Sequence, residues 1–404
     1  MDPYLQLLTL VATLFFLPKL LQRLRIPAPL TEFGLGVLLG PTALGVIDPS
    51  GVLLGLSGFG ITALFLFAGL EVELPELHAR RRTLTVHLLL QVGLVGVATG
   101  VGVWLGLDRA VAPLVGAAVM SPSVGYITTA LEARPMRPDL AGWIMQKAIA
   151  GELMAIAMVL VFANTRTPRE LAFGLGAVGG LMVAVPLLIY VFHHLILPWA
   201  PRTEFPFLLI LALLAAYVSH HVGVHYLAGA FVVGVIARRY LDRLSRAGIE
   251  TASVGEALIA FRFFAAFFIP FFFFLVGVRL PAGAFSREAA LLALALLAVA
   301  VPLRVIPTLL HRRVGLRERW HEATSVGLFL VPTTVFTFAV AELLRERFDL
   351  APWVYGGLVA YGAATGLVPL LCPGAAVESG SEIVDVATEE VLRDRQITGG
   401  PRGG

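Results

Sequence analysis

Residues Met120–Gly125 read Met-Ser-Pro-Ser-Val-Gly and lie near the middle of a long apolar stretch. Proline lacks a backbone N–H and its ring clashes with the preceding turn, so Pro122 predicts a break or kink in a helix. Leu330–Thr334 reads Leu-Val-Pro-Thr-Thr and places Pro332 near the middle of a second apolar stretch. Interrupted membrane helices at corresponding places in two halves of a chain indicate an ion or substrate site near the bilayer midplane. An ordinary proline kink in each helix is the alternative.

The composition predicts a membrane protein. Hydrophobic residues make up 58% of the 404 residues and charged residues 14%, whereas soluble domains typically carry about 25% charged residues. Apolar stretches of about 18 or more residues are best interpreted as membrane spans. We therefore expect an all-α polytopic membrane fold of about 13 transmembrane helices. The apolar segments are approximately 3–20, 30–47, 52–74, 83–106, 110–131, 139–163, 171–195, 205–222, 225–240, 260–279, 287–310, 322–344 and 352–372.

These segments leave little room for a soluble domain. We expect one membrane domain over residues 1–373 and a disordered cytoplasmic tail over 374–404, because the tail is rich in Gly, Glu and Asp. Leu241–Ala260 carries mixed charges and is predicted to be an amphipathic connector along the cytoplasmic face. Basic residues cluster in one set of alternate loops, notably at Arg80–Arg82 and Arg312–Arg313. Because such loops favour the cytoplasm, the N-terminus is expected outside and the C-terminus inside.

A lone carboxylate interrupts the apolar stretch Lys147–Met158, which reads Lys-Ala-Ile-Ala-Gly-Glu-Leu-Met-Ala-Ile-Ala-Met. Glu152 lies 13 residues after Asp139, which is about 20 Å along a helix and near the middle of a hydrocarbon core about 30 Å thick. An ionisable residue at that depth costs about 2.5–3.5 kcal/mol and is usually functional. It holds a proton or a hard cation, but not both at once, and this competition is the basis of exchange. A structural glutamate paired with Lys147 or an arginine is the alternative. The other acidic residues considered lie in loops or near segment ends: Glu71, Glu73, Glu132, Glu204 and Glu342.

Other polar residues belong to the same expected site. Hydroxyl oxygens beside the two breaks are candidate cation ligands, and they belong to Ser121, Ser123, Thr333 and Thr334. Arg304 is expected to neutralise the facing ends of the two broken helices, unless it extends toward Arg312 and the cytoplasm. Lys147 lies about 140° round the helix from Glu152, so a direct pair between them is poor. It either compensates charge at the site or snorkels to the cytoplasm.

Several stretches form an ordered series over residues 1–372: Pro27–Glu32 with Gly34–Gly45, Leu64–Glu71, Ser121–Gly125, Leu227–Val235 and Ile269–Leu280. Together they resemble the motifs of the monovalent cation/proton antiporter superfamily, in its bacterial sodium/proton exchanger and Kef-like potassium/proton antiporter branch. The resemblance implies inverted repeats, two crossing discontinuous helices in a core domain, and a separate dimerisation domain. It also implies alternating access of elevator type and a homodimer in the bacterial inner (plasma) membrane.

The resemblance also assigns residues. The family's ion-binding pair falls on Gly151 and Glu152, so the ion-binding carboxylate is retained and the first member of the pair is absent. The family's basic residue falls on Arg304. Relatives often have Pro-Arg-Gly-Glu where this chain has Pro332–Val335, Pro-Thr-Thr-Val, and small apolar residues where it has Lys147.

These observations predict a secondary antiporter that exchanges Na⁺, K⁺ or Li⁺ for H⁺ through Glu152, with one proton per cation and hence no net charge moved. The alternative is a transport-inactive or conductive relative that acts as a membrane sensor or regulatory partner. Gly151 and Lys147 favour that alternative, because a fixed cation near the site could replace the transported one. The sequence carries no phosphate loop, nucleophile elbow or nucleic-acid signature, so we expect neither an enzyme nor a nucleic-acid partner, and no cofactor.

Overall fold

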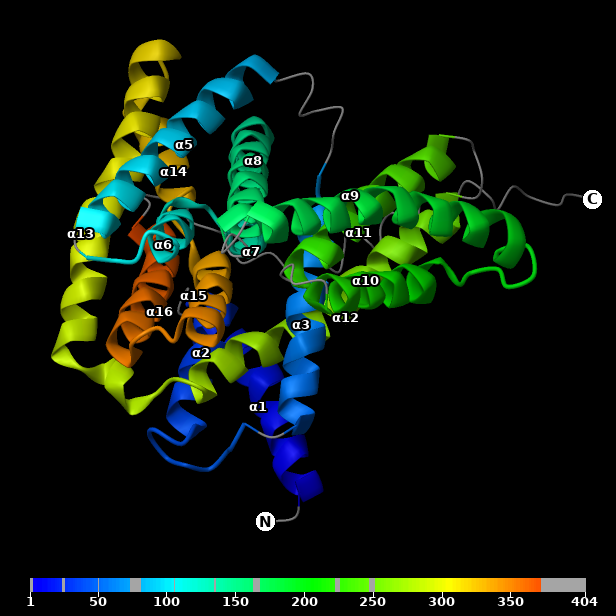
Figure 1. Cartoon of the computed structure of the whole chain (residues 1–404), viewed down its shortest axis with the longest axis horizontal. Coiled ribbons are helices and arrows are strands. Elements are labelled where there is room, and N and C mark those ends of the chain that lie inside the picture. Colours follow the sequence, from blue (N-terminus) through cyan, green and yellow to red (C-terminus); the bar gives the residue numbers. More distant parts are fainter. Residues whose placement is uncertain are drawn as a thin grey trace, which may run out of the picture.

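A computed structural model describes residues 3–23, 26–49, 51–72, 81–104, 106–133, 136–162, 168–221, 226–246 and 251–371. Within these ranges all regular secondary structure is helical (Figure 1). Nine helical spans of the described residues are long and apolar enough to cross a membrane, and three shorter apolar helices accompany them. The chain is therefore an integral membrane protein. The predicted disordered tail lies outside the described residues.

Each of the thirteen predicted segments overlaps a helix or a pair of consecutive helices. The first half of the chain contains α1 (Pro3–Gln22), α2 (Ala28–Leu39), α3 (Gly51–Leu70), α5 (Arg81–Trp104), α6 (Val111–Met120), α7 (Val124–Ala133), α8 (Pro138–Phe162), α9 (Pro168–Val191) and the π-helix η1 (Phe192–Ile196). The second half contains α10 (Glu204–His221), α11 (Tyr226–Arg246), α12 (Thr251–Val278), η2 (Ala282–Phe285), α13 (Arg287–Leu310), the π-helix η3 (His311–Gly315), α14 (Trp320–Phe329), α15 (Thr334–Phe348), α16 (Pro352–Leu367) and η4 (Val368–Leu371).

The predicted connector over Leu241–Ala260 is corrected by the structure. Helix α11 continues to Arg246 and α12 begins at Thr251, so most of this stretch forms the ends of two long helices. Its mixed charges lie where membrane helices approach the interface and charged side chains reach water, so they do not require a separate surface helix. Residues 247–250 lie outside the described ranges.

The helices gather in distinct groups (Figure 1). Helices α5 to α8 and α13 to α16 form one group, at the left of the view, and α9 to α11 extend to the other side. Helix α3 joins the groups, because it packs against α7 of the first group and against α11 of the second. Helix α12 packs along α3 and α2. One apolar cluster fills the first group and extends to α3, α10, α11 and α12. A second lies among α3 and α9 to α12, and a third lies between α1, α2, α3 and α12.

Glycines let some of these helices approach backbone to backbone. A Cβ atom on Gly36 of α2 would lie 2.0 Å from the carbonyl oxygen of Phe274 in α12, and one on Gly277 would lie 2.2 Å from that of Phe33. Without a hydrophobic force between helices in lipid, close contact through small residues is a main source of attraction. The contact between α3 and α11 uses glycines in the same way.

Both predicted interruptions are present. Helix α6 ends at Met120 and α7 begins at Val124, while α14 ends at Phe329 and α15 begins at Thr334. Four other helices, α1, α9, α12 and α13, contain prolines without being interrupted. Proline alone therefore does not break a helix in this protein. The interruptions also need alternative partners for the backbone groups that they release.

Candidate ion-binding site

The two interruptions meet inside the protein. The backbone N–H of Ser123 donates to the carbonyl oxygen of Pro332 at 2.8 Å. The four hydroxyl residues beside the breaks, Ser121, Ser123, Thr333 and Thr334, are fully buried. Irregular backbone at membrane depth is tolerated only inside the protein or against a water-filled cavity, and these residues satisfy that condition. The site is therefore built from segments about 200 residues apart in the chain.

The side chain of Glu152 lies beside the first residue of the half-helix α7. Its side chain, on α8, is 3% exposed, and its Oε2 accepts a hydrogen bond from the backbone N–H of Val124 at 2.9 Å. Val124 is the first residue of α7, where the helix macrodipole leaves partial positive charge. Among the described residues Glu152 forms no ion pair. The alternative of a glutamate neutralised by Lys147 or an arginine is therefore not seen there.

Gly151 lets α8 pack directly against the first break. A Cβ atom at this position would lie 2.9 Å from both Cδ and Cγ of Pro122, closer than such atoms approach one another. Gly151 occupies the position of the first member of the family's ion-binding pair. It can offer only backbone groups to an ion.

The predicted hydroxyl ligands divide into two pairs. Within the described residues, Oγ of Ser121 and Oγ of Ser123 are buried without a hydrogen-bond partner. The Thr333 hydroxyl shares a hydrogen bond with that of Thr365 at 3.2 Å, and the Thr334 hydroxyl donates to the carbonyl of Gly362 at 2.9 Å. The serines of the first break thus have unused hydrogen-bonding capacity. The threonines of the second break use theirs to hold that break against α16.

Arg304 lies at the carboxyl ends of the other two half-helices. From α13, its Nη1 donates to the carbonyl of Val331 and its Nη2 to that of Leu330, both at 2.5 Å. Nη1 also reaches the carbonyl of Val119 in α6 at 3.5 Å. The last carbonyls of a helix are unsatisfied and carry partial negative charge, so the buried guanidinium lies where that charge accumulates. It does not extend toward Arg312, which was the alternative.

Three further donors that the sequence reasoning missed close the end of α6. Its last three carbonyls accept hydrogen bonds from Thr337 of α15 at 2.8 Å, Tyr361 of α16 at 2.7 Å and Gln91 of α5 at 2.5 Å. Gln91 and Thr337 are isolated polar residues in apolar stretches, and this was the available signal. Their targets depend on which helices pack together.

Glu152 is not the one buried carboxylate. Glu32 of α2 and Glu204, the first residue of α10, are buried as well, and Oε2 of Glu32 has no hydrogen-bond partner among the described residues. The burial of Glu32 was not predicted from the sequence. It lies only four residues after the start of α2, where hydropathy does not distinguish a buried side chain from one that reaches water.

Lys147 does not snorkel to water. Its side chain is 4% exposed, and its Nζ lies 3.5 Å from the ring centroid of Trp143, one turn earlier in α8. The guanidinium of Arg312 lies 4.0 Å from the same centroid. Both cations are therefore within the range of attraction to one aromatic ring. The predicted charge-compensating role of Lys147 stays a prediction.

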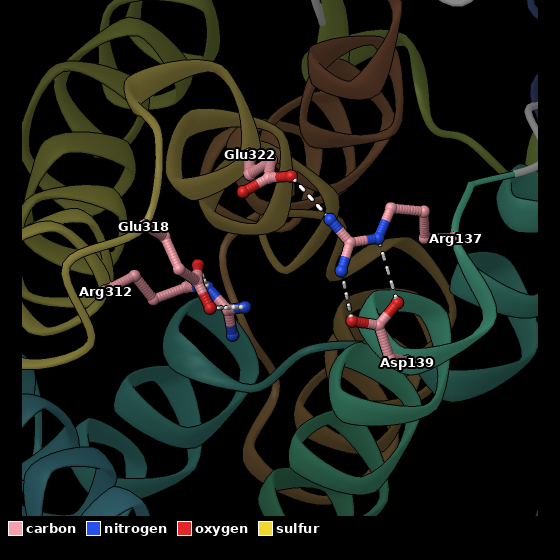
Figure 2. Close-up of polar contacts among 5 residues, drawn as sticks. All are labelled: Arg137, Asp139, Arg312, Glu318 and Glu322. Carbon is pink, nitrogen blue, oxygen red and sulfur yellow. Dashed lines mark hydrogen bonds and ion pairs between the residues drawn. The ribbon is translucent and has the colours of Figure 1, made fainter.

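Ion pairs lie near the beginnings of α8 and α14 and after α13 (Figure 2). Arg312 binds Glu318 through two nitrogens at 2.6 and 2.5 Å, and its side chain is 2% exposed. Arg137 binds Asp139 and Glu322, each at 2.8 Å, but its side chain is 63% exposed. The Arg137–Glu322 pair connects the beginnings of α8 and α14, the two segments that lead to Glu152 and to the second break.

A large cavity of about 540 Å³ lies between α3, α10, α12 and α15. Its polar lining includes Ser57, Thr62, Arg279, Glu342 and Glu346. The ion pairs of Arg279 with the two glutamates, at 3.6 and 3.8 Å, connect the end of α12 with α15 at this cavity. The cavity therefore lies between α15 of the first group and α10 on the other side of the molecule.

Interrupted helices that meet inside a membrane protein, with a buried carboxylate at one half-helix end, define the class of ion-coupled secondary transporters. The family model described as "Sodium/hydrogen exchanger, transmembrane" matches residues 8–367, and the chain belongs to this family. This result confirms the predicted membership of the monovalent cation/proton antiporter superfamily.

Individual relatives agree with that assignment. The chain is 26% identical over 376 residues to "Probable Na(+)/H(+) antiporter 3" of Methanocaldococcus jannaschii, covering 89% of this chain and 92% of that protein. It is 26% identical over 246 residues to the glutathione-regulated potassium-efflux system protein of Haemophilus influenzae, covering 57% of this chain and 40% of that protein. The solved structure of the sodium proton antiporter MjNhaP1 from M. jannaschii matches with a TM-score of 0.67 at 15% identity, covering 92% of this chain and 99% of that chain. The two proteins therefore share a fold.

Proposed function

We propose that the protein is a secondary antiporter that exchanges a monovalent cation, Na⁺, K⁺ or Li⁺, for H⁺ through Glu152. The observation that carries the proposal is the hydrogen bond from the Val124 N–H to Glu152, which holds a buried carboxylate at the positive end of α7. The ionised carboxylate binds the cation. Protonation removes the charge and releases the cation, so the two ligands use the same group in turn.

The neighbouring residues have defined roles in this proposal. Ser121 and Ser123 supply hydroxyl oxygens to the cation, since both oxygens are buried without partners among the described residues. Pro122 and Pro332 open the two helices. Arg304 supplies the positive charge that the facing carbonyl ends require, as its hydrogen bonds to both half-helices support.

Transport is proposed to be electroneutral, with one proton per cation. Position 151, the place of the family's other ion-binding residue, is a glycine held against Pro122. The site therefore has one titrating carboxylate where the breaks meet. In proteoliposomes, exchange should proceed at the same rate with and without an ionophore that clamps the membrane potential. Exchange that moves net charge, measured as a transport current across the proteoliposome membrane, would overturn the stoichiometry of one proton per cation.

The wider mechanism is proposed by relation to the family. The two interrupted segments are proposed to be crossing helices of inverted repeats, and the meeting of the breaks at Ser123 and Pro332 supports this. The protein is proposed to be a homodimer in the bacterial inner membrane, with its N-terminus outside, its C-terminus cytoplasmic and an elevator-type motion. The cavity between α3, α10, α12 and α15 supports a path from the external side, because α15 runs from the break toward that side.

The test is antiport in everted membrane vesicles that contain a pH-sensitive dye. Addition of Na⁺, K⁺ or Li⁺ to energised vesicles should dissipate the proton gradient for the wild type and not for Glu152→Gln. Glu288→Gln, at an exposed position in the first turn of α13, is the matched control and should behave as the wild type. Normal gradient dissipation by Glu152→Gln would overturn the proposal. A folded wild type that responds to none of the three cations would do so too, and would favour the sensor or regulatory alternative.

A further inference from the structure

A second cavity, of about 40 Å³, lies between α5, α8 and α13 beside Pro122. Its nitrogen-bearing lining residues are Gln91, His87, Lys147, Arg304 and His311, and no carboxylate of the described residues lines it. About 10–15 Å³ suffices for one water molecule, so the cavity holds a few waters or one small ion. A lining with cationic side chains and no anionic ones favours an anion as that ion.

Lys147 forms no ion pair within the part of the chain that the structure describes. Its side chain is buried, and its Nζ lies against the face of the Trp143 ring. The carboxylate of Glu318 is already held by two nitrogens of Arg312. Glu152 lies on the same helix but about 140° round it. Because burying an ammonium without a close carboxylate is costly, an anion in the cavity would stabilise the charged form of Lys147.

The other polar groups of the cavity differ in how fully they are used. Arg304 donates to carbonyls of both half-helices, the Gln91 amide donates to Met120, and the Thr308 hydroxyl donates to the carbonyl of Arg304. Nε2 of His87, in contrast, is buried with no partner among the described residues. The unused donor capacity therefore belongs to Lys147 of α8, and His87 of α5 adds a ring nitrogen that has no partner within the described ranges.

We propose that this cavity binds one small monovalent inorganic anion, of the size of chloride, through Lys147 Nζ. The volume excludes larger organic anions, and the transported cation is repelled by Lys147 and Arg304. The site is thus distinct from the one at Glu152. Pro122 lines the cavity and also packs against Gly151, so an anion here neutralises Lys147 immediately beside the break that forms the cation site.

Trp143 provides a binding signal that does not depend on transport. Bromide and iodide quench indole fluorescence, and an anion on Lys147 Nζ lies beside this ring because the nitrogen itself is 3.5 Å from the ring centroid. The full chain would retain Trp143 as its one tryptophan, with phenylalanine at 104, 199, 320 and 353, and would be purified in detergent. Bromide would be titrated at constant ionic strength against gluconate, which is too large for the cavity.

We expect quenching that saturates with bromide and is reversed by chloride. The saturable component should be lost in Lys147→Met and retained in Lys19→Met, the matched substitution at an exposed position of α1. Quenching that rises linearly without saturation in the unsubstituted background, or a saturable component that survives Lys147→Met, would overturn the proposal. If Lys147→Met does not fold, anomalous scattering from bromide-soaked crystals of the wild type decides, and no peak at Lys147 would refute the site.

Discussion

Replacement of Arg304 by methionine should destabilise the fold strongly, because its guanidinium holds the carbonyl end of α14 by two short hydrogen bonds. It donates to Leu330 and Val331 at 2.5 Å, while the contact with Val119 at 3.5 Å contributes little. A hydrogen bond to a charged group contributes about 1.5–3 kcal/mol, so the two short bonds predict a loss of about 3–6 kcal/mol. Methionine avoids the cost of burying a charge, which favours the lower end of that range. A loss of about 3 kcal/mol is about a hundredfold in the unfolding equilibrium.

The assay is reversible unfolding in mixed micelles of dodecylmaltoside and sodium dodecyl sulfate, followed by circular dichroism. Arg304→Lys should lie between the wild type and Arg304→Met, because it keeps the charge but loses the paired donors of the guanidinium. Arg287→Met, at the exposed start of the same helix, is the control and should unfold as the wild type. A loss below about 1 kcal/mol for Arg304→Met, or a lysine variant no more stable than the methionine variant, would refute the assignment of Arg304 to the helix ends.

Three further substitutions test the packing around the site. Gly151→Ala should lower the free energy of unfolding by about 1–3 kcal/mol through overpacking, since the new Cβ would lie 2.9 Å from the ring of Pro122. Its control is Gly142→Ala on the same helix, where the new Cβ meets nothing within 4 Å. Equal stability of the two variants would contradict the contact between Gly151 and Pro122. Arg312→Gln should cost about 3 kcal/mol, as expected for breaking a buried ion pair, and an unchanged unfolding midpoint would show that the pair is not formed. Arg137→Gln should leave the midpoint unchanged, because exposed ion pairs contribute little; a clear loss of stability would show that its tie between α8 and α14 is structural.

The sequence predicted much of the fold because membrane helices are specified by local chemistry. Long apolar runs gave segments that overlap the observed helices, and the two prolines flanked by hydroxyl residues indicated both interruptions. The prediction was wrong for Leu241–Ala260, where mixed charges suggested a surface connector but two long helices end and begin. Composition reports that a stretch is less apolar and does not report whether a helix continues through it.

Burial was harder to predict than helix position. Glu152 was expected to be buried from its depth in an apolar run, and it is. Lys147 was open to snorkelling by the same reasoning, yet it lies enclosed beside Trp143. Glu32 is buried close to a helix end, where it was not expected. Distance along a helix is a local quantity, but the enclosure of a side chain depends on which neighbouring helices cover it.

The sequence by itself determined the helical class, the positions of the breaks and the depth of the carboxylate, because hydropathy, proline geometry and helix rise act within one segment. Only the tertiary structure decided which groups meet. It brought Ser123 to Pro332, Arg304 to two half-helix ends, and Gly151 against Pro122. These contacts join segments that are far apart in the chain, and they form because backbone groups released at a break within the membrane must find partners inside the protein.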